Sequence, residues 1–156
     1  MNTDNPSYCV DKPIFLVGAE RSGTTVLRLM LDHHPQIAWC YEFEYVVDQI
    51  SDNGDFPQLE AYYEWLETHR IFQSTGFEID RSLSYPQLAN SFLCQRCQRL
   101  DRTGKPLVGA TVHRHFDRLL QIWPNARFIH VPYDQAMLSY PQTTPYSLPD
   151  PKLMLF

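Results

Sequence analysis

The order of apolar runs along the chain predicts an α/β fold with three layers, in which helices flank a parallel sheet. An uninterrupted apolar run, too short for an amphipathic helix, predicts a buried strand at 14–17, and short, largely apolar segments predict strands or extended segments at 36–41, 107–112 and 127–131. Segments whose apolar residues recur at helical spacing lie between these strands, so right-handed crossovers would join consecutive strands in parallel. A glycine-bounded turn follows the first run and would lie at the carboxyl end of its strand.

The helices have sequence signals of their own. The first is expected from about residues 22–24 to Asp32, with Ser22 or Thr24 as its N-cap and Pro35 blocking its extension. Apolar residues at helical spacing, with proline or glycine at the ends, predict three further helices at 56–72, 84–102 and 114–122.

Length and composition describe an ordinary globular domain. The chain has 156 residues, of which 44% are hydrophobic and 20% charged. A net charge of −5 argues against non-specific nucleic-acid binding and against docking on anionic membranes. The longest apolar runs are too short to span a bilayer. The polar, acidic start of the chain is unlike a signal or transit peptide, so a cytoplasmic location is the default expectation.

The four cysteines do not have the pattern of a secreted disulfide framework. Cys94 and Cys97 form a Cys-x-x-Cys pair, but they fall in an expected helix, which disfavours a thioredoxin-type motif. A zinc site would need a second ligand pair at suitable spacing, and none is evident. The pair is therefore interpreted as two small residues on one helical face.

The turn from Gly18 to Thr25 has the features of an anion-binding site. The first amides of a helix have no partner within the helix, and the helix dipole adds partial positive charge at the same end. Gly18 and Gly23 allow the backbone to approach a bound oxyanion. Arg21 adds a forked cation suited to phosphate or sulfate oxygens, and Thr24 and Thr25 add hydroxyl donors.

The spacing is close to that of the nucleotide-binding P-loop, but Thr24 stands where that motif has lysine. With its Arg-Ser-Gly-Thr-Thr sequence and a following helix that ends in His-Pro, the chain resembles the sulfotransferase family. The resemblance continues through 26–38 and reappears at 104–110 and 125–130. It implies a P-loop-like α/β fold and a sulfotransferase activity.

The resemblance also implies the ligands. In the family this loop holds the 5′-phosphosulfate of 3′-phosphoadenosine-5′-phosphosulfate (PAPS), the sulfuryl donor. The acceptor would be a hydroxyl or amine of a small molecule, a glycan or a peptide. Arg21, amides and hydroxyls can meet the developing charge, so no metal is expected. The donor-binding residues would be Gly18, Ala19, Glu20, Arg21, Ser22, Gly23, Thr24 and Thr25.

A general base must take the proton of the acceptor. In relatives that use a carboxylate, a glutamate follows the second strand by a few residues, as Glu42 does here. Aromatic neighbours on both sides would desolvate this carboxylate and raise its pKa. Glu44 is the second candidate for the general base, because the two glutamates would share a face if the segment were extended. His113 is a third candidate, because some sulfotransferases use histidine.

The resemblance breaks after residue 131. The family continues with an Arg-Asp-x-Arg-Asp pattern and a serine, and the first arginine and this serine hold the 3′-phosphate. Here Tyr133 occupies the place of that arginine and Pro141 the place of the serine. A proline-rich sequence follows. We therefore expect a sulfotransferase-like domain over 1–131, incomplete at its C-terminal side, and an irregular tail over 132–156, as in a truncated or frame-shifted product.

Two other functions stay open on the sequence alone. One is a catalytically impaired sulfotransferase fragment that keeps only the anion-binding loop. The other is a P-loop nucleotide kinase or NTPase, which would need a lysine and a magnesium-binding carboxylate that the sequence does not place. The sequence leaves the oligomeric state and the acceptor unidentified.

Overall fold

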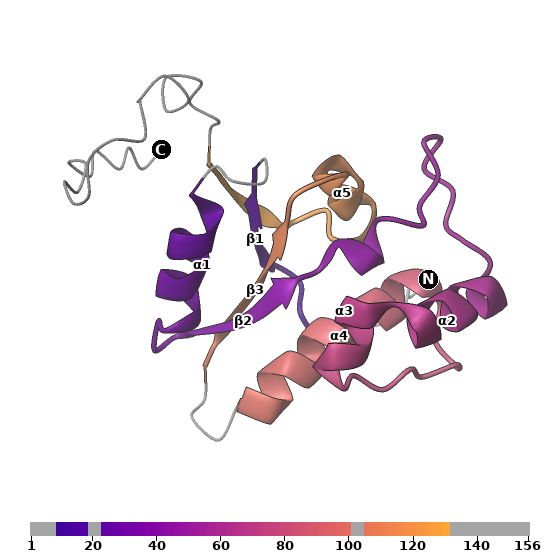
Figure 1. The fold of residues 1–156 in the computed structure, drawn as a ribbon, viewed down its shortest axis with the longest axis horizontal. Helices are drawn as coiled ribbons and strands as arrows, with labels where there is room; N and C mark the ends of the chain where they lie inside the picture. The colour runs from indigo at the N-terminus through magenta and orange to yellow at the C-terminus, as the bar shows by residue number, and fades with distance from the viewer. Residues whose placement is uncertain (1–8, 19–22, 101–104, 132–156) are drawn as a thin grey trace, which may run out of the picture.

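Parallel strands form a sheet in the order β2-β3-β1-β4 in the computed structural model, which describes residues 9–18, 23–100 and 105–131 (Figure 1). The strands are β1 (Ile14–Val17), β2 (Ile37–Glu42), β3 (Leu107–Val112) and β4 (Arg127–His130). All lie within a residue of the positions that the apolar runs predict. The prediction of a parallel α/β sheet flanked by helices is thus confirmed.

Both faces of the sheet are packed, as alternating side chains along a strand require. On one face, Leu16, Ile37 and Trp39 pack against α1 (Thr24–Asp32). On the other face, a larger core contains Phe15 and Val17 of β1 together with buried residues of the remaining helices. Figure 1 shows α1 on one side of the strands and α2, α3 and α4 on the other.

The helix expected over 56–72 is wrong, because the structure has two helices in this region, α2 (Leu59–Thr68) and α3 (Arg70–Thr75). His69 separates them with an extended backbone, and its Nδ1 accepts a hydrogen bond from the Phe72 N–H over 3.3 Å. This side-chain cap starts a new helix where the periodicity suggested continuation. The helix expected over 84–102 is α4 (Tyr85–Leu100), and 101–104 lie outside the described residues.

The helix expected over 114–122 is also corrected. The chain first forms a 3₁₀ turn, η2 (Phe116–Arg118), and only then the short α5 (Leu119–Ile122). His115 precedes them with φ 52° and ψ 26°, a left-handed conformation that stops a helix from starting at residue 114.

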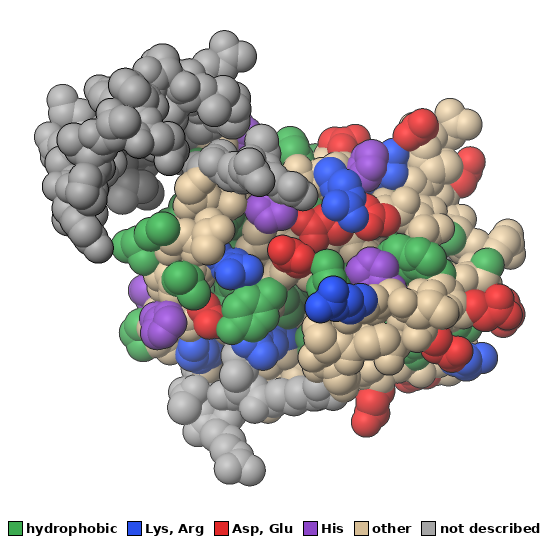
Figure 2. Space-filling model, in the orientation of Figure 1, with side chains coloured by type: hydrophobic (Ala, Val, Ile, Leu, Met, Phe, Trp, Pro, Cys, Tyr) green, Lys and Arg blue, Asp and Glu red, His purple; other side chains and the backbone are tan. Residues whose placement is uncertain are grey.

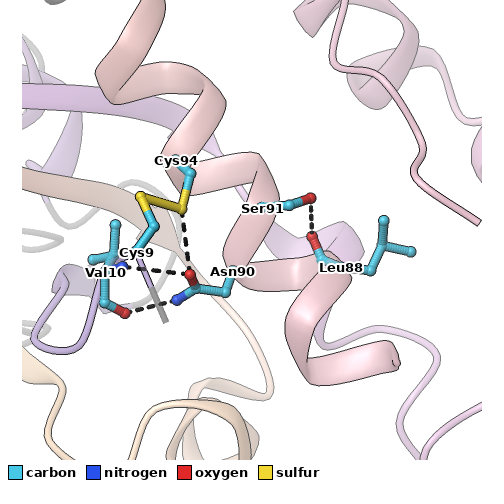
Figure 3. The surroundings of a disulfide bond; sticks show 6 residues. All are labelled: Cys9, Val10, Leu88, Asn90, Ser91 and Cys94. Atoms are coloured by element: carbon cyan, nitrogen blue, oxygen red, sulfur yellow. Dashed lines mark hydrogen bonds between the residues drawn. A yellow bond between two sulfur atoms is a disulfide. The ribbon is translucent and has the colours of Figure 1, made fainter. Parts of the chain in front are cut away.

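A disulfide joins Cys9 to Cys94 of α4, with 5.9 Å between the Cα atoms (Figure 3). The sequence had indicated only a small-residue role for Cys94, because its partner lies 85 residues away along the chain. Asn90, one turn earlier, accepts from the Val10 N–H over 3.4 Å and donates to the Val10 carbonyl over 2.6 Å. These contacts attach the segment that leads into β1 to α4.

The open edge of β2 is covered by two cations. Lys105 Nζ donates to the Ile37 carbonyl over 3.0 Å, and Arg96 Nε donates to the Trp39 carbonyl over 2.8 Å. Charged side chains at such an edge prevent it from pairing with another strand. Within the described residues, none of the helices has the length and apolar character needed to cross a membrane.

Candidate functional site at the carboxyl edge of the sheet

The predicted site residues that the structure describes meet at one edge of the sheet. β1, β2 and β3 run in parallel and end at Val17, Glu42 and Val112, so the residues that follow them lie along the same edge. Gly18 and His113 are the first residues after their strands. Figure 2 shows acidic, basic and histidine side chains gathered over the end of β3 and the segment after β2.

The loop that would bind the anion is described at its two ends, while Ala19, Glu20, Arg21 and Ser22 lie outside the described residues. At the far end, Gly23 is the N-cap of α1, with φ 84° and ψ 6°. The prediction of Ser22 or Thr24 as N-cap is wrong, because Gly23 is the N-cap and Thr24 is the first helical residue. A glycine adopts this left-handed turn without strain, which explains why it occupies the cap.

The surroundings of Gly23 leave its backbone accessible. A Cβ atom at this position would meet no heavy atom of the described residues within 4 Å, which leaves open space beside the first turn of α1. The Thr24 side chain is buried and that of Thr25 is exposed. The first turn of α1 carries no acidic side chain. This helix end therefore favours an anion through its amides and dipole.

Glu42 is the last residue of β2 and is half-buried. The pairing of β2 with β3 shifts register between Cys40 and Glu42, so that Glu42 lies opposite Thr111. After this irregularity the Phe43 N–H donates to the Thr111 carbonyl over 2.9 Å. Of its aromatic neighbours, Phe43 is fully buried, whereas Tyr41 is 48% exposed.

Glu44 has a different environment, because the strand ends at Glu42 and Glu44 begins the 3₁₀ turn η1 (Glu44–Val46). Its side chain is buried, and its Oε1 accepts a hydrogen bond from the His113 N–H over 2.8 Å. Burial raises the pKa of the Glu44 carboxyl; this hydrogen bond lowers it, while the nearby Glu42 charge raises it further. The expectation of two equivalent glutamates on one extended face does not hold.

His113 connects this carboxylate to the loop. Its Nδ1 lies 3.1 Å from the Gly18 carbonyl oxygen, at the first residue after β1. A carbonyl oxygen only accepts hydrogen bonds, so Nδ1 must carry the hydrogen of this contact. In the neutral ring the lone pair is then on Nε2, which is the ring atom able to accept a proton.

Two arginines that the sequence analysis did not single out hold the segment after β2 against the segment after β3. The Arg114 guanidinium forms a two-pronged ion pair with Asp48, at 2.8 and 2.6 Å. Arg118 is buried and donates to the carbonyls of Val47 and Ile50, and also to Asp52. Both arginines and both aspartates are spaced by four residues, a signal that could have suggested the pairing.

No group of three or more His, Cys, Asp and Glu side chains suited to a metal ion occurs within the described ranges. A family model described as the sulfotransferase family matches residues 13–146, which include the loop, both glutamates and His113. No curated protein matches the sequence.

Proposed function

The chain belongs to the sulfotransferase family, and from this premise we propose that it transfers a sulfuryl group from PAPS to a hydroxyl or amine of an acceptor. The family match carries the proposal, because it spans most of the chain and includes both the anion-binding loop and the polar residues at the same sheet edge. The acceptor would be a small molecule, a glycan or a peptide.

In this proposal the loop binds the phosphosulfate of the donor. Arg21, Ser22, Thr24 and Thr25 would contact its oxygens, together with backbone amides between Gly18 and the first turn of α1. The open space beside Gly23 and the lack of acidic side chains in that turn support this role. Neutralising the leaving phosphate without a metal ion is compatible with this set of donors.

Glu42 would be the general base. During transfer the acceptor oxygen or nitrogen forms a bond to sulfur and loses its proton to Glu42, while the bond from sulfur to the 5′-phosphate oxygen breaks. 3′-Phosphoadenosine-5′-phosphate (PAP) then leaves with that bonding pair. Glu42 is half-buried, so an acceptor can reach it, whereas Glu44 is buried and its Oε1 is occupied by the His113 N–H. Nε2 of His113 is the alternative base.

Transfer of label from [³⁵S]PAPS tests this proposal. The wild-type protein is incubated with phenols, aliphatic alcohols, amines and sugars, and labelled products are separated from the donor. We expect a labelled product, and we expect E42Q to lower its rate about a hundredfold or more. E64Q removes an exposed carboxylate of α2 and should leave the rate unchanged. Hydrolysis of ATP without any consumption of PAPS would contradict the proposal and favour an NTPase.

A further inference from the structure

Three consecutive contacts connect the ends of the three neighbouring strands at the carboxyl edge. The Phe43 N–H donates to the Thr111 carbonyl, Glu44 Oε1 accepts from the His113 N–H, and the His113 ring contacts the Gly18 carbonyl. The last two form a continuous chain from the turn after β2, through the residue after β3, to the residue after β1. The role proposed for Glu42 leaves this chain unused.

The Gly18 carbonyl is the last described group before the loop. Because a peptide group is planar, the direction of this carbonyl sets the plane in which the backbone leaves β1. Gly18 has no side chain that could fix this plane, and its φ of 151° is one that other residues rarely adopt. A hydrogen bond from the His113 ring therefore restricts the rotation of this peptide group.

His113 can do this only if its own backbone is held. It follows directly after β3 and precedes His115, where the chain takes a left-handed turn. The buried Glu44 side chain supplies the contact that fixes the His113 N–H, at 2.8 Å. Glu44 is thus connected to Gly18 through His113.

We propose that Glu44 is a positioning residue that, through the backbone of His113 and its ring, fixes the Gly18 carbonyl where the chain leaves β1 and thereby favours binding of the donor nucleotide at the carboxyl edge of the sheet. The effect of this role on catalysis rests on the proposed function. The contacts that carry the role are present in the protein without ligand. This role assigns the two glutamates different tasks: Glu42 receives the proton of the acceptor, and the buried Glu44 holds Gly18 through His113.

Paired substitutions separate this role from a general structural one. E44Q keeps an oxygen that can accept from the His113 N–H, and E44M keeps the shape without an acceptor. H113N keeps a side-chain N–H that can donate to the Gly18 carbonyl, and H113L does not. We expect E44M and H113L to bind PAP about tenfold more weakly than wild type, and E44Q and H113N to stay within about twofold.

Kinetics and spectroscopy complete the test. Once an acceptor that the wild-type protein sulfates has been identified, kinetics can be measured for the variants. E44M should raise the KM for PAPS more than it lowers kcat, whereas E42Q should lower kcat. In the protein without ligand, the amide resonances of Gly18 and Gly23 should shift in E44M and H113L and remain near wild-type positions in E44Q and H113N. This NMR measurement needs no donor binding, so it decides the positioning role even if the wild-type protein fails to bind PAP.

The outcomes distinguish the two proposals. A wild-type protein that does not bind PAP would overturn the proposed function alone. A folded E44M protein with wild-type PAP affinity and unshifted Gly18 and Gly23 resonances would overturn the positioning role. If E44M does not fold, H113L against H113N decides, because both keep the backbone N–H that Glu44 accepts from and differ in the side-chain contact to Gly18. Equal PAP affinity and equal resonances in these two proteins would contradict the proposal.

Discussion

The backbone N–H of His113 donates to Oε1 of Glu44 over 2.8 Å, where the Glu44 residue is only 5% exposed. The hydrogen bonds that backbone amides donate to this carboxylate do not fully replace the water that it loses on burial. The protonated form of Glu44 is therefore favoured in the folded protein relative to the unfolded chain. This imbalance makes the stability of the fold depend on pH.

We predict that the free energy of unfolding falls as the pH rises above the ordinary glutamate pKa of 4.5, and that E44Q removes this component. Burial raises the pKa of Glu44 in the folded state, so the folded protein holds the proton at pH values where the unfolded chain has released it. The contribution of Glu44 to the free energy of unfolding is then fully present below pH 4.5, and it is lost as the pH rises through the pKa that Glu44 has in the folded protein.

Urea unfolding of wild type and E44Q between about pH 4 and about pH 8 measures this difference. The E44Q protein should gain stability relative to wild type as the pH rises. The comparison isolates Glu44 from its titratable neighbours Glu42 and His113, because both proteins retain them. Parallel curves for the two proteins over this range would show that the Glu44 pKa is not raised.

Arg118 should contribute strongly to stability through backbone carbonyls and little through its ion pair. R118M keeps most of the buried stem and removes the donors to the Val47 and Ile50 carbonyls, which we expect to cost about 2–3 kcal/mol in free energy of unfolding. D52N is the matched control, because the Asp52 side chain is 98% exposed and its pair with Arg118 is solvated. Equal losses in R118M and D52N would contradict this division.

Gly109 has no room for a side chain in the middle of β3. A Cβ atom there would lie 2.5 Å from the Ile14 carbonyl oxygen and would overlap the Trp39 ring. The ring is fully buried, and its Nε1 donates to Thr111 Oγ1 over 3.2 Å, so it cannot move aside easily. We expect G109A to lower the free energy of unfolding by about 2–3 kcal/mol, measured by denaturant unfolding. A G109A protein with wild-type stability would contradict this packing.

The strands β1, β2 and β3 could be predicted because each is a largely apolar run that is mostly buried, and the shared edge followed from their parallel order. The helix break at His69 could not, because it depends on the His69 ring, which caps Phe72 and lies 4.5 Å from the Trp65 ring. The link between Glu44 and His113 was likewise hidden, because it depends on the chain leaving the strand geometry after Glu42. Local pattern predicts periodic elements, whereas contacts between distant segments decide where those elements stop.

The role of the loop as a donor site for PAPS is the central claim, and titration calorimetry with PAP and AMP tests it most directly. The two nucleotides differ in the 3′-phosphate, which distinguishes the donor of a sulfotransferase from common adenine nucleotides. In this chain Tyr133 and Pro141 stand in place of the residues that hold this phosphate in the family, so we predict that PAP and AMP bind within about threefold of each other through the 5′-phosphate, and that R21A weakens the binding of both about tenfold. Nucleotide binding that R21A leaves unchanged, or no binding of PAP to the wild-type protein, would contradict the account.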